Sequence, residues 1–407
     1  MNDMSTQPTD GLSDYVAAAR AWLDSMEPRF GHEARKGLTL EEDLALGREY
    51  MRLKSEAGYA CITLPRELGG GGGSEIQKIL FGQEEFQHDF PTEYFGVSQG
   101  MPVPMVLRYA DKETGERLAR PAIRGETIWC QLFSEPSAGS DLAAVRTRAT
   151  RDGDGWRIEG QKLWTSWAQF ADYAIAVVRT DPTVPKHAGL TFFWLDMKSP
   201  GITVKLVRKL AGESEINEVF FDNVYVPDSQ RMGEVGAGFR VAIETLMIER
   251  YSVADDALGG PSLGEFAKLA ANLKINGRPA IDDGQVRRTL AEAIVERQGL
   301  RSIHRRALSA IAGGQEPGPE GSIRKLRLCR RRQIMGELAM DLMGSDGMIL
   351  APEATRMQDH AWSWIDVPGV RIAGGTDEIL RNTIAEKILG LPQDYRPDKK
   401  VPFNQIG

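Results

Sequence analysis

The spacing of apolar residues divides the chain into three stretches. Over residues 12–124, apolar positions recur every three or four residues. Between residues 126 and 232 the spacing changes to every second residue, and after Pro227 the longer spacing returns nearly to the end of the chain. A period near 3.6 predicts amphipathic helices and a period of two predicts half-buried strands. The expected order is therefore helices, then strands, then helices. The clearest helical stripe consists of Leu12, Tyr15, Val16, Ala19, Trp22 and Leu23.

The middle stretch predicts a series of short strands. Apolar and charged residues alternate over residues 145–149 and again over residues 156–159, and the Asp-Gly-Asp-Gly run at residues 152–155 predicts a hairpin turn between them. Short strands separated by turns are typical of a small β-barrel or sandwich. We expect the further strands at Tyr173–Arg179, Leu190–Asp196, Ile202–Val207 and residues 218–226.

This order of elements is not the alternation of a parallel α/β protein. It predicts an α+β fold that is mostly α. We expect a helical N-terminal domain over residues 1–125, a β-barrel middle domain over residues 126–233 and a helical C-terminal domain over residues 234–407.

Five consecutive glycines, residues 69–73, interrupt the first helical stretch. Any glycine run satisfies the spacing of a nucleotide-binding loop, and no βαβ pattern surrounds this one. The run is instead expected to be a flexible surface turn before the next helix.

Composition and charge narrow the class of protein. The 407 residues are 42% hydrophobic and 26% charged, which is usual for a soluble globular protein. A net charge of −7 argues against a general nucleic-acid or membrane-surface binder. The polar start of the chain and the lack of a long apolar run predict neither a signal peptide nor a membrane span, so we expect a cytoplasmic protein. Three cysteines and five dispersed histidines indicate neither a disulfide framework nor a metal site.

Residues 129–141 are the most informative segment. An apolar, aromatic run ends in a loop of Ser, Pro, Ala and Gly with an acidic residue at each end. Small residues allow a planar ring or a phosphate to approach the main chain closely. An ordinary strand followed by a surface turn fits these residue types equally well.

Four segments, taken together, resemble the acyl-CoA dehydrogenase family. The most specific reads Phe-Ser-Glu-Pro followed, after Ser137, by Ala-Gly-Ser-Asp. The resemblance extends over residues 12–393 and implies a helical N-domain, a β-barrel middle domain for flavin and substrate, and a four-helix-bundle C-domain. The segments are residues 133–141, 164–166, 217–227 and 374–379.

The resemblance implies FAD as the cofactor. Trp164 would stack near the flavin, and Ser166 would supply a hydroxyl at its reactive N5 edge. An aromatic-rich barrel core is the alternative for isolated tryptophans such as Trp129 and Trp156. The residues implied to bind the cofactor are Gln131, Phe133, Ser134, Gly139, Ser140, Trp164, Thr165, Ser166, Thr376 and Glu378.

The catalytic base departs from the commonest family pattern. Dehydrogenation of an acyl thioester removes an α-proton, usually to a carboxylate, while a β-hydride leaves to flavin N5. Many relatives carry that glutamate just before a Gly-Thr pair near the C-terminus, where this chain has Gly374. A second family arrangement places it on the helix after the β domain, where this chain has Glu249.

Glu249 and Arg250 are expected on the same face of that helix as an apolar stripe, three residues after Leu246 and Met247. Charges on a buried stripe are costly unless they are paired or functional, and contact with an unrelated partner across a helix interface is the alternative. The functional interpretation makes Glu249 the base, Arg250 a fixed charge and the Gly374 N–H a polariser of the thioester carbonyl. The stripe consists of Phe239, Ala242, Ile243, Leu246, Met247, Val253 and Ala254. The residues implied to bind substrate are Ser140, Met247, Arg250 and Gly375.

Two further features concern partners. A basic helix over residues 324–332 is typical of a solvated face or a subunit contact, with CoA phosphates or DNA as alternative partners. Family contacts to the flavin of a neighbouring subunit would fall at Leu273 and Asp341, where the usual arginine and glutamine are missing. In this respect the chain resembles bacterial relatives that form mixed tetramers.

The resulting hypothesis is an acyl-CoA dehydrogenase of fatty acid β-oxidation. It would convert an acyl-CoA to its trans-2-enoyl-CoA and pass electrons to an electron-transfer flavoprotein. A homotetramer is expected, with a homodimer or a mixed tetramer as alternatives, and no nucleic-acid or membrane partner. The alternative functions are a flavin-binding partner subunit, or an oxidase or non-CoA relative. The sequence leaves the length, branching and ring content of the acyl chain open.

Overall fold

A computed structural model describes residues 9–210, 212, 215–252, 261–312, 318–349 and 360–406. Within its helices, the side chains at positions 9, 10, 248–252, 308, 311 and 312 lie outside the description. The chain forms two compact units. The first contains Met1–Lys209, Ser214–Ser252 and Tyr395–Gly407, and the second contains Leu210–Glu213 and Val253–Asp394.

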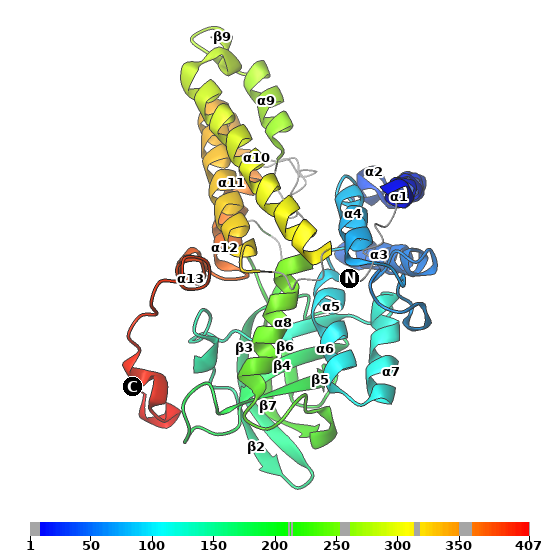
Figure 1. The fold of residues 1–407 in the computed structure, drawn as a ribbon, viewed down its shortest axis with the longest axis vertical. Helices are drawn as coiled ribbons and strands as arrows, with labels where there is room; N and C mark the ends of the chain where they lie inside the picture. The colour runs from blue at the N-terminus through cyan, green and yellow to red at the C-terminus, as the bar shows by residue number, and fades with distance from the viewer. Residues whose placement is uncertain are drawn as a thin grey trace, which may run out of the picture. The chain divides into compact units, whose positions relative to one another are not determined.

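The first unit begins with helices, as the apolar spacing predicts. In the first of them Ala19 and Leu23 are fully buried, with Tyr15 and Trp22 packed against the same core, which confirms the predicted stripe. Helices α5, α6 and α7 pack against one another (Figure 1). The helices are α1 (Thr9–Phe30), α2 (His32–Arg35), α3 (Leu40–Glu56), α4 (Glu75–Glu85), α5 (Gly96–Gly100), α6 (Pro102–Tyr109) and α7 (Lys112–Ile123).

The glycine run precedes helix α4, as predicted, but it is not a flexible surface turn. Gly70 and Gly71 are buried, and the backbone N–H of Gly72 donates to Leu64 O at 2.8 Å. A Cβ at Gly70 would stand 2.4 Å from the Leu64 carbonyl oxygen, and one at Gly71 equally close to that of Gly58. The prediction of flexibility was wrong because these glycines serve close backbone packing.

The strands form one curled, seven-stranded sheet, an open half-barrel. Its order is β1-β4-β2-β3-β7-β6, with β5 paired to β4. Strands β2 and β3 form the predicted hairpin, with Asp152 opposite Gly155. Three strands keep the predicted bounds: β4 (Tyr173–Arg179), β5 (Leu190–Asp196) and β6 (Ile202–Val207). The others are β1 (Trp129–Leu132), β2 (Arg148–Asp152), β3 (Gly155–Ser166) and β7 (Ile216–Pro227).

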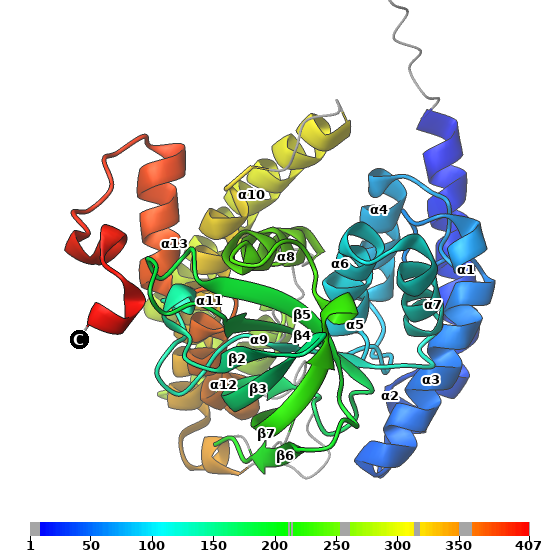
Figure 2. The same ribbon diagram turned by 90° about the horizontal axis from the view of Figure 1, so that it is seen from below.

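Strand β4 lies at the centre of this unit because it is buried on both faces. Ile175 and Val177 join the core shared with the N-terminal helices, whereas Ala174, Ala176 and Val178 join the core inside the curled sheet. Alternate residues of a strand point to opposite faces, so β4 separates the two cores. Figure 2 shows the sheet with the N-terminal helices to one side.

Helix α8 (Gly238–Ser252) follows the sheet and packs on β4 and β5. Among the described side chains of this helix, the buried ones are Val241, Ala242 and Thr245. The predicted stripe was therefore partly wrong, because Ile243 and Met247 are 41% and 36% exposed. Val253 and Ala254, the last predicted members, lie outside the described residues.

The second unit is a helical bundle. In it α9 (Leu263–Asn272), α10 (Gly284–Ala312), α11 (Gly321–Met343) and α12 (His360–Ile372) lie side by side (Figure 1). The short strands β8 (Lys274–Ile275) and β9 (Arg278–Pro279) pair between α9 and α10, and α13 (Asp377–Thr383) packs against α11.

Short 3₁₀ segments and one π-helical segment lie between the main elements. The 3₁₀ segments are Arg66–Leu68, Leu142–Ala144, Asp228–Gln230, Ala280–Asp282, Gly344–Met348, Pro397–Lys400 and Phe403–Gln405, and Ile384–Ile388 is π-helical. Among the described helices, none has the length and apolarity needed to cross a bilayer. The predicted α+β, mostly helical fold class, with its β middle part and helical C-terminal bundle, is confirmed.

Candidate active site

The loop at residues 133–141 leaves the end of β1 as a tight turn followed by an exposed segment. The backbone N–H of Glu135 donates to Ala138 O at 2.8 Å, and the N–H of Ala138 donates back to Glu135 O at 3.1 Å. Phe133 is buried, Ser134 is half-buried, and Gly139 and Ser140 are exposed. A Cβ built on Gly139 meets no atom within 4 Å. The loop therefore offers open main chain to a ligand at its second half.

A buried ion pair fixes the first half of this loop. Lys162 of β3 is completely buried, and its Nζ donates to Glu135 Oε1 at 2.8 Å. The same ammonium donates to the carbonyl oxygens of Phe133 at 3.0 Å and Val177 at 2.7 Å. The Glu135 carboxylate also accepts the N–H groups of Arg146 and Thr147. One pair thus joins the loop to both β3 and β4.

The charge of the partner and the burial shift the pKa of each member of this pair in opposite directions. Burial lowers the pKa of Lys162, and the Glu135 carboxylate partly counteracts this effect. Burial alone would raise the pKa of Glu135, but the Lys162 ammonium and the two backbone donors lower it below its usual value. The sequence gives no direct signal for this arrangement, because a lysine in an alternating strand is exposed by default.

A β-bulge in β3 presents the predicted flavin residues. The pairing of β3 with β7 shifts register between Lys162 and Thr165. At the bulge Trp164 has a φ of +62°, a left-handed conformation that is rare for a bulky residue, and its side chain is 60% exposed. Ser166 is half-buried at the end of the strand. Strained residues of this kind cluster at functional sites.

Among the predicted cofactor-binding residues near the bulge, two have a buried polar atom with no hydrogen-bond partner within the described part of the chain. These atoms are Thr165 Oγ1 and Gln131 Nε2, from strands β3 and β1, which contact each other. Such atoms are rare in folded proteins and indicate a missing partner. A flavin, which needs polar contacts at its ring edge and an apolar wall, fits this set of groups together with Trp164.

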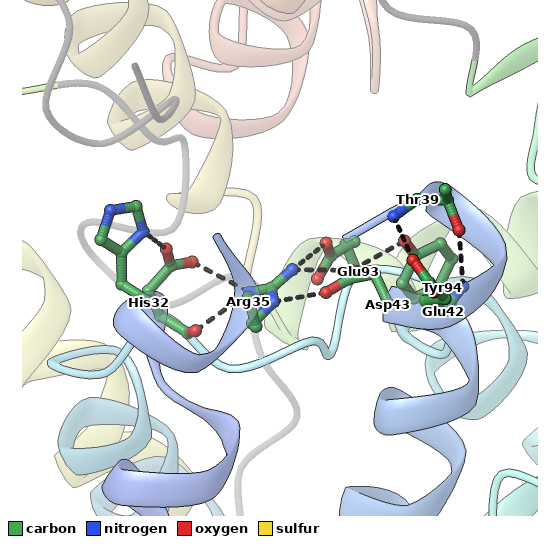
Figure 3. Close-up of polar contacts among 8 residues, drawn as sticks. His32, Arg35, Thr39, Glu42, Asp43, Glu93 and Tyr94 are labelled. Carbon is green, nitrogen blue, oxygen red and sulfur yellow. Dashed lines mark hydrogen bonds and ion pairs between the residues drawn. The ribbon is translucent and has the colours of Figure 1, made fainter. Parts of the chain in front are cut away.

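A polar cluster in the N-terminal helices supports the segment that follows the bulge. Arg35 donates to both carboxylate oxygens of Asp43, at 2.7 and 2.9 Å, and to Glu93 at 2.8 Å (Figure 3). Tyr94 donates to the same Asp43 at 2.8 Å. The Tyr94 ring lies 4.5 Å, centroid to centroid, from Trp167, which directly follows the predicted flavin segment.

Helix α8 carries the predicted base. Glu249 and Arg250 lie in its last turns, but their side chains are outside the described part of the structure. Met247, predicted to bind substrate, is 36% exposed. The helix is tied to α6, because Tyr109 Oη donates to Glu244 Oε2 at 2.5 Å.

The remaining predicted site residues belong to the second unit. Gly374 and Gly375 have φ values of +64° and +103°. Thr376 caps α13 by accepting the N–H of Ile379 at 3.3 Å, and Glu378 is exposed. The structure therefore groups the eight predicted residues from 131 to 166 in one unit and Gly374, Gly375, Thr376 and Glu378 in the other.

Part of the basic helix α11 organises this glycine loop. Lys325 Nζ donates to the carbonyl oxygen of Gly375 at 2.5 Å. Arg327 pairs with Glu296 at 2.5 Å, and Arg332 pairs with Asp366 at 3.1 Å. These three cations have partners within the bundle, so the basic run is not simply a solvated face. Among the described residues, no group of three or more His, Cys, Asp or Glu side chains has a metal-site arrangement.

Comparison with known proteins identifies the family. Models of the acyl-CoA dehydrogenase N-terminal, middle and C-terminal domains match residues 16–126, 130–224 and 236–389. The chain belongs to the acyl-CoA dehydrogenase family. It is an oxidoreductase that acts on acyl-CoA, and FAD is its cofactor.

Two similar proteins from Mycobacterium tuberculosis differ in how much of their length this chain covers. Acyl-CoA dehydrogenase IpdE1 is 33% identical over 398 residues, which cover 95% of this chain and 99% of that protein. Acyl-CoA dehydrogenase FadE34 is 39% identical over 328 residues, which cover 80% of this chain and 44% of that protein. This chain therefore spans less than half of FadE34.

Solved structures of the acyl-CoA dehydrogenase family share the fold. The one described as the Tcur3481-Tcur3483 steroid ACAD has a TM-score of 0.78 at 23% identity and covers 96% of this chain and 100% of its own. The ChsE4-ChsE5 complex from Mycobacterium tuberculosis has a TM-score of 0.76 at 25% identity, with 97% and 100% covered. A glutaryl-CoA dehydrogenase from Mycobacterium smegmatis in complex with FADH2 has a TM-score of 0.72 at 21% identity, with 96% and 97% covered.

Proposed function

We propose that this acyl-CoA dehydrogenase uses the Glu249 carboxylate to remove the α-proton of its substrate, giving the trans-2-enoyl-CoA. FAD, when bound, supplies the acceptor for the hydride that leaves the β-carbon. The observation that carries this assignment is the bare loop position at Gly374, which has no side chain and a φ of +64°. Because no carboxylate stands there, we assign the base to another element, the helix α8.

The packing of α8 supports this assignment. The helix lies on β4 and β5, and β4 pairs directly with β1, the strand that leads into the loop at 133–141. Tyr109 and Arg108 hold Glu244 on the same helix, at 2.5 and 3.7 Å. A base requires such a fixed position relative to its substrate, since misplacement by about 1 Å costs much of the rate.

The proposed binding roles are those that the family resemblance implies. Gln131, Phe133, Ser134, Gly139, Ser140, Trp164, Thr165 and Ser166 would hold the cofactor, with Thr376 and Glu378 from the second unit. Ser140, Met247, Arg250 and Gly375 would contact the substrate. The N–H of Gly374 would polarise the thioester carbonyl, which makes the α-proton more acidic.

Anaerobic mixing with a panel of acyl-CoAs tests the base. We expect the flavin absorption band to bleach in the wild type and to persist in Glu249→Gln, because general bases contribute roughly 10²–10⁴-fold in rate. Glu234→Gln is the matched control, since that side chain is 90% exposed. Bleaching of Glu249→Gln at the wild-type rate would show that the base lies elsewhere.

The same panel addresses the acyl chain. Moving the base from loop to helix changes the walls of the acyl cavity, and we therefore propose branched, cyclic or long acyl chains as substrates. A preference for short straight acyl chains would contradict this proposal.

The proposed electron acceptor is an electron-transfer flavoprotein, and rapid reoxidation of the reduced protein by air alone would instead indicate an oxidase.

A second candidate function is that of one subunit in a mixed assembly. It is favoured by Leu273 and Asp341, which replace two residues that contact flavin across a subunit boundary in many relatives. Purification of the chain alone distinguishes the two. Retention of FAD and bleaching by acyl-CoA support the self-sufficient enzyme, whereas a colourless protein that gains FAD only with a related subunit supports the mixed assembly.

A further inference from the structure

The end of the chain returns to the sheet of the first unit. Residues Tyr395–Gly407 belong to that unit although the whole second unit precedes them. The N–H of Phe403 donates to Val184 O, and the N–H of Asn404 donates to Pro182 O, both at 2.9 Å. Pro402 forms a β-bridge with Pro185. We call residues 395–406 the C-terminal strap.

The strap is anchored by an aromatic ring between two cations. The guanidinium of Arg179 lies 3.7 Å from the centroid of the Phe403 ring, and that of Arg146 lies 5.5 Å from it. Arg179 is only 3% exposed and donates to Ala143 O at 2.5 Å and to Val145 O at 3.2 Å. Removal of the ring would expose a cation that organises residues 143–145, directly after the loop at 133–141.

One lysine connects the strap to that loop. Lys186 Nζ lies 2.7 Å from Asp141 Oδ2 and 2.7 Å from Asp398 Oδ2, and the lysine side chain is only 13% exposed. Asp141 ends the exposed half of the loop, and Asp398 belongs to the strap. Two carboxylates on one ammonium restrain the lysine more strongly than one, because each adds a charge-assisted contact of defined geometry.

We propose that the C-terminal strap positions the loop at residues 137–141, and that Lys186 is the positioning residue that transmits this effect. The strap itself contacts neither cofactor nor substrate in this role. It holds Lys186 and Arg179, and these hold the loop in the conformation that binds its ligand. That the ligand is FAD or acyl-CoA rests on the proposed function, whereas the restraint on the loop rests on the contacts alone.

Hydrogen exchange of the full-length protein, measured by mass spectrometry, tests the restraint. We expect faster exchange over residues 137–146 and 180–188 in Lys186→Met, Asp398→Asn and Phe403→Ala, with unchanged exchange in β6 and β7. Asp394→Asn, an exposed position just before the strap, is the matched control. Unchanged exchange over 137–146 in all three variants would overturn the proposal.

The binding consequence is measured on the same variants. We expect the FAD dissociation constant to rise several-fold in Phe403→Ala and Lys186→Met and less in Asp398→Asn, because Asp398→Asn leaves Lys186 its bond to Asp141. Faster loop exchange together with unchanged affinity for both FAD and acyl-CoA would contradict the positioning role. If the wild type fails to bleach with any acyl-CoA, the proposed function fails, while the exchange data still decide the restraint.

Discussion

At the residue scale, we expect substitutions in the buried Lys162–Glu135 pair to change the stability of the protein most. We predict that Lys162→Met destabilises the protein by about 3–5 kcal/mol, because it leaves a carboxylate buried without its cation. Glu135 is 6% exposed and Lys162 is fully buried, so water does not compensate. The double variant Lys162→Met, Glu135→Gln should recover part of the loss, because it removes the unpaired charge and keeps an acceptor for the N–H groups of Arg146 and Thr147.

Urea unfolding of these variants measures the effect. Lys112→Met is the control, since its side chain is 90% exposed. A Lys162→Met protein as stable as that control would contradict the structural role of the pair.

The same carboxylate predicts a pH dependence. The pKa of Glu135 is lowered in the folded state, with its burial outweighed by Lys162 and backbone donors. The contribution of this carboxylate to the free energy of unfolding is therefore fully present above its pKa in the unfolded chain, about 4.3. It is lost as the pH falls through the lower pKa of the folded state. The stability difference between wild type and Glu135→Gln should be constant near neutral pH and narrow below about pH 4. A difference that grows on acidification would show the opposite linkage.

The site segments were predicted from the family resemblance, because the residue types at 137–140 fit a surface turn equally well. Neither the residue types nor the resemblance indicated that Lys162 is buried or that Lys186 joins two carboxylates. Both depend on partners distant in sequence, Glu135 and Asp398. A single sequence does not specify such pairs, because a lysine is compatible with many surface positions.

At the scale of elements, the glycine run offers a direct test. We predict that Gly70→Ala destabilises the protein by about 1–3 kcal/mol, because the added Cβ would lie 2.4 Å from the Leu64 carbonyl oxygen. Gly82→Ala in helix α4 is the matched comparison. No atom lies within 4 Å of its Cβ position, and alanine there should stabilise by about 0.5–1 kcal/mol. Thermal melting of both variants shows whether each substitution raises or lowers the stability. A Gly70→Ala protein as stable as the wild type would mean that the loop can rearrange.

The strands were predictable and the buried face of α8 was not. Strands β4 and β5 are short, nearly continuous apolar runs and β6 alternates, and turn residues bound all three, so these strands have the predicted bounds. In α8, apolar residues occupy most of the circumference, and the spacing cannot select one face. The helix buries Thr245, whose Oγ1 donates to Val241 O at 2.8 Å, and exposes Ile243. Because the Thr245 hydroxyl has a hydrogen-bond partner within its own helix, this polar residue can be buried in the core.

At the scale of the whole molecule, two adjacent exposed apolar residues of the bundle provide a test for an assembly. Ile294 and Val295 of α10 are 48% and 72% exposed in the single chain, an unfavourable state in water. We predict that the protein forms an oligomer and that Val295→Asp reduces its mass toward the 45.0 kDa of one chain. Light scattering after gel filtration measures this. Arg301→Gln, exposed on the same helix but on a different face, is the control, and an unaffected assembly in Val295→Asp would exclude the face that carries Val295.

The C-terminal strap also has a consequence for how the protein is made. Chains fold progressively during synthesis, with N-terminal domains usually first, yet the first unit includes the last residues of this chain. That unit can therefore be completed only after the intervening residues 253–394 of the second unit have been synthesised. A premature stop codon just before residue 395 would affect the part of the protein that was translated first, although it leaves every strand of the sheet in place.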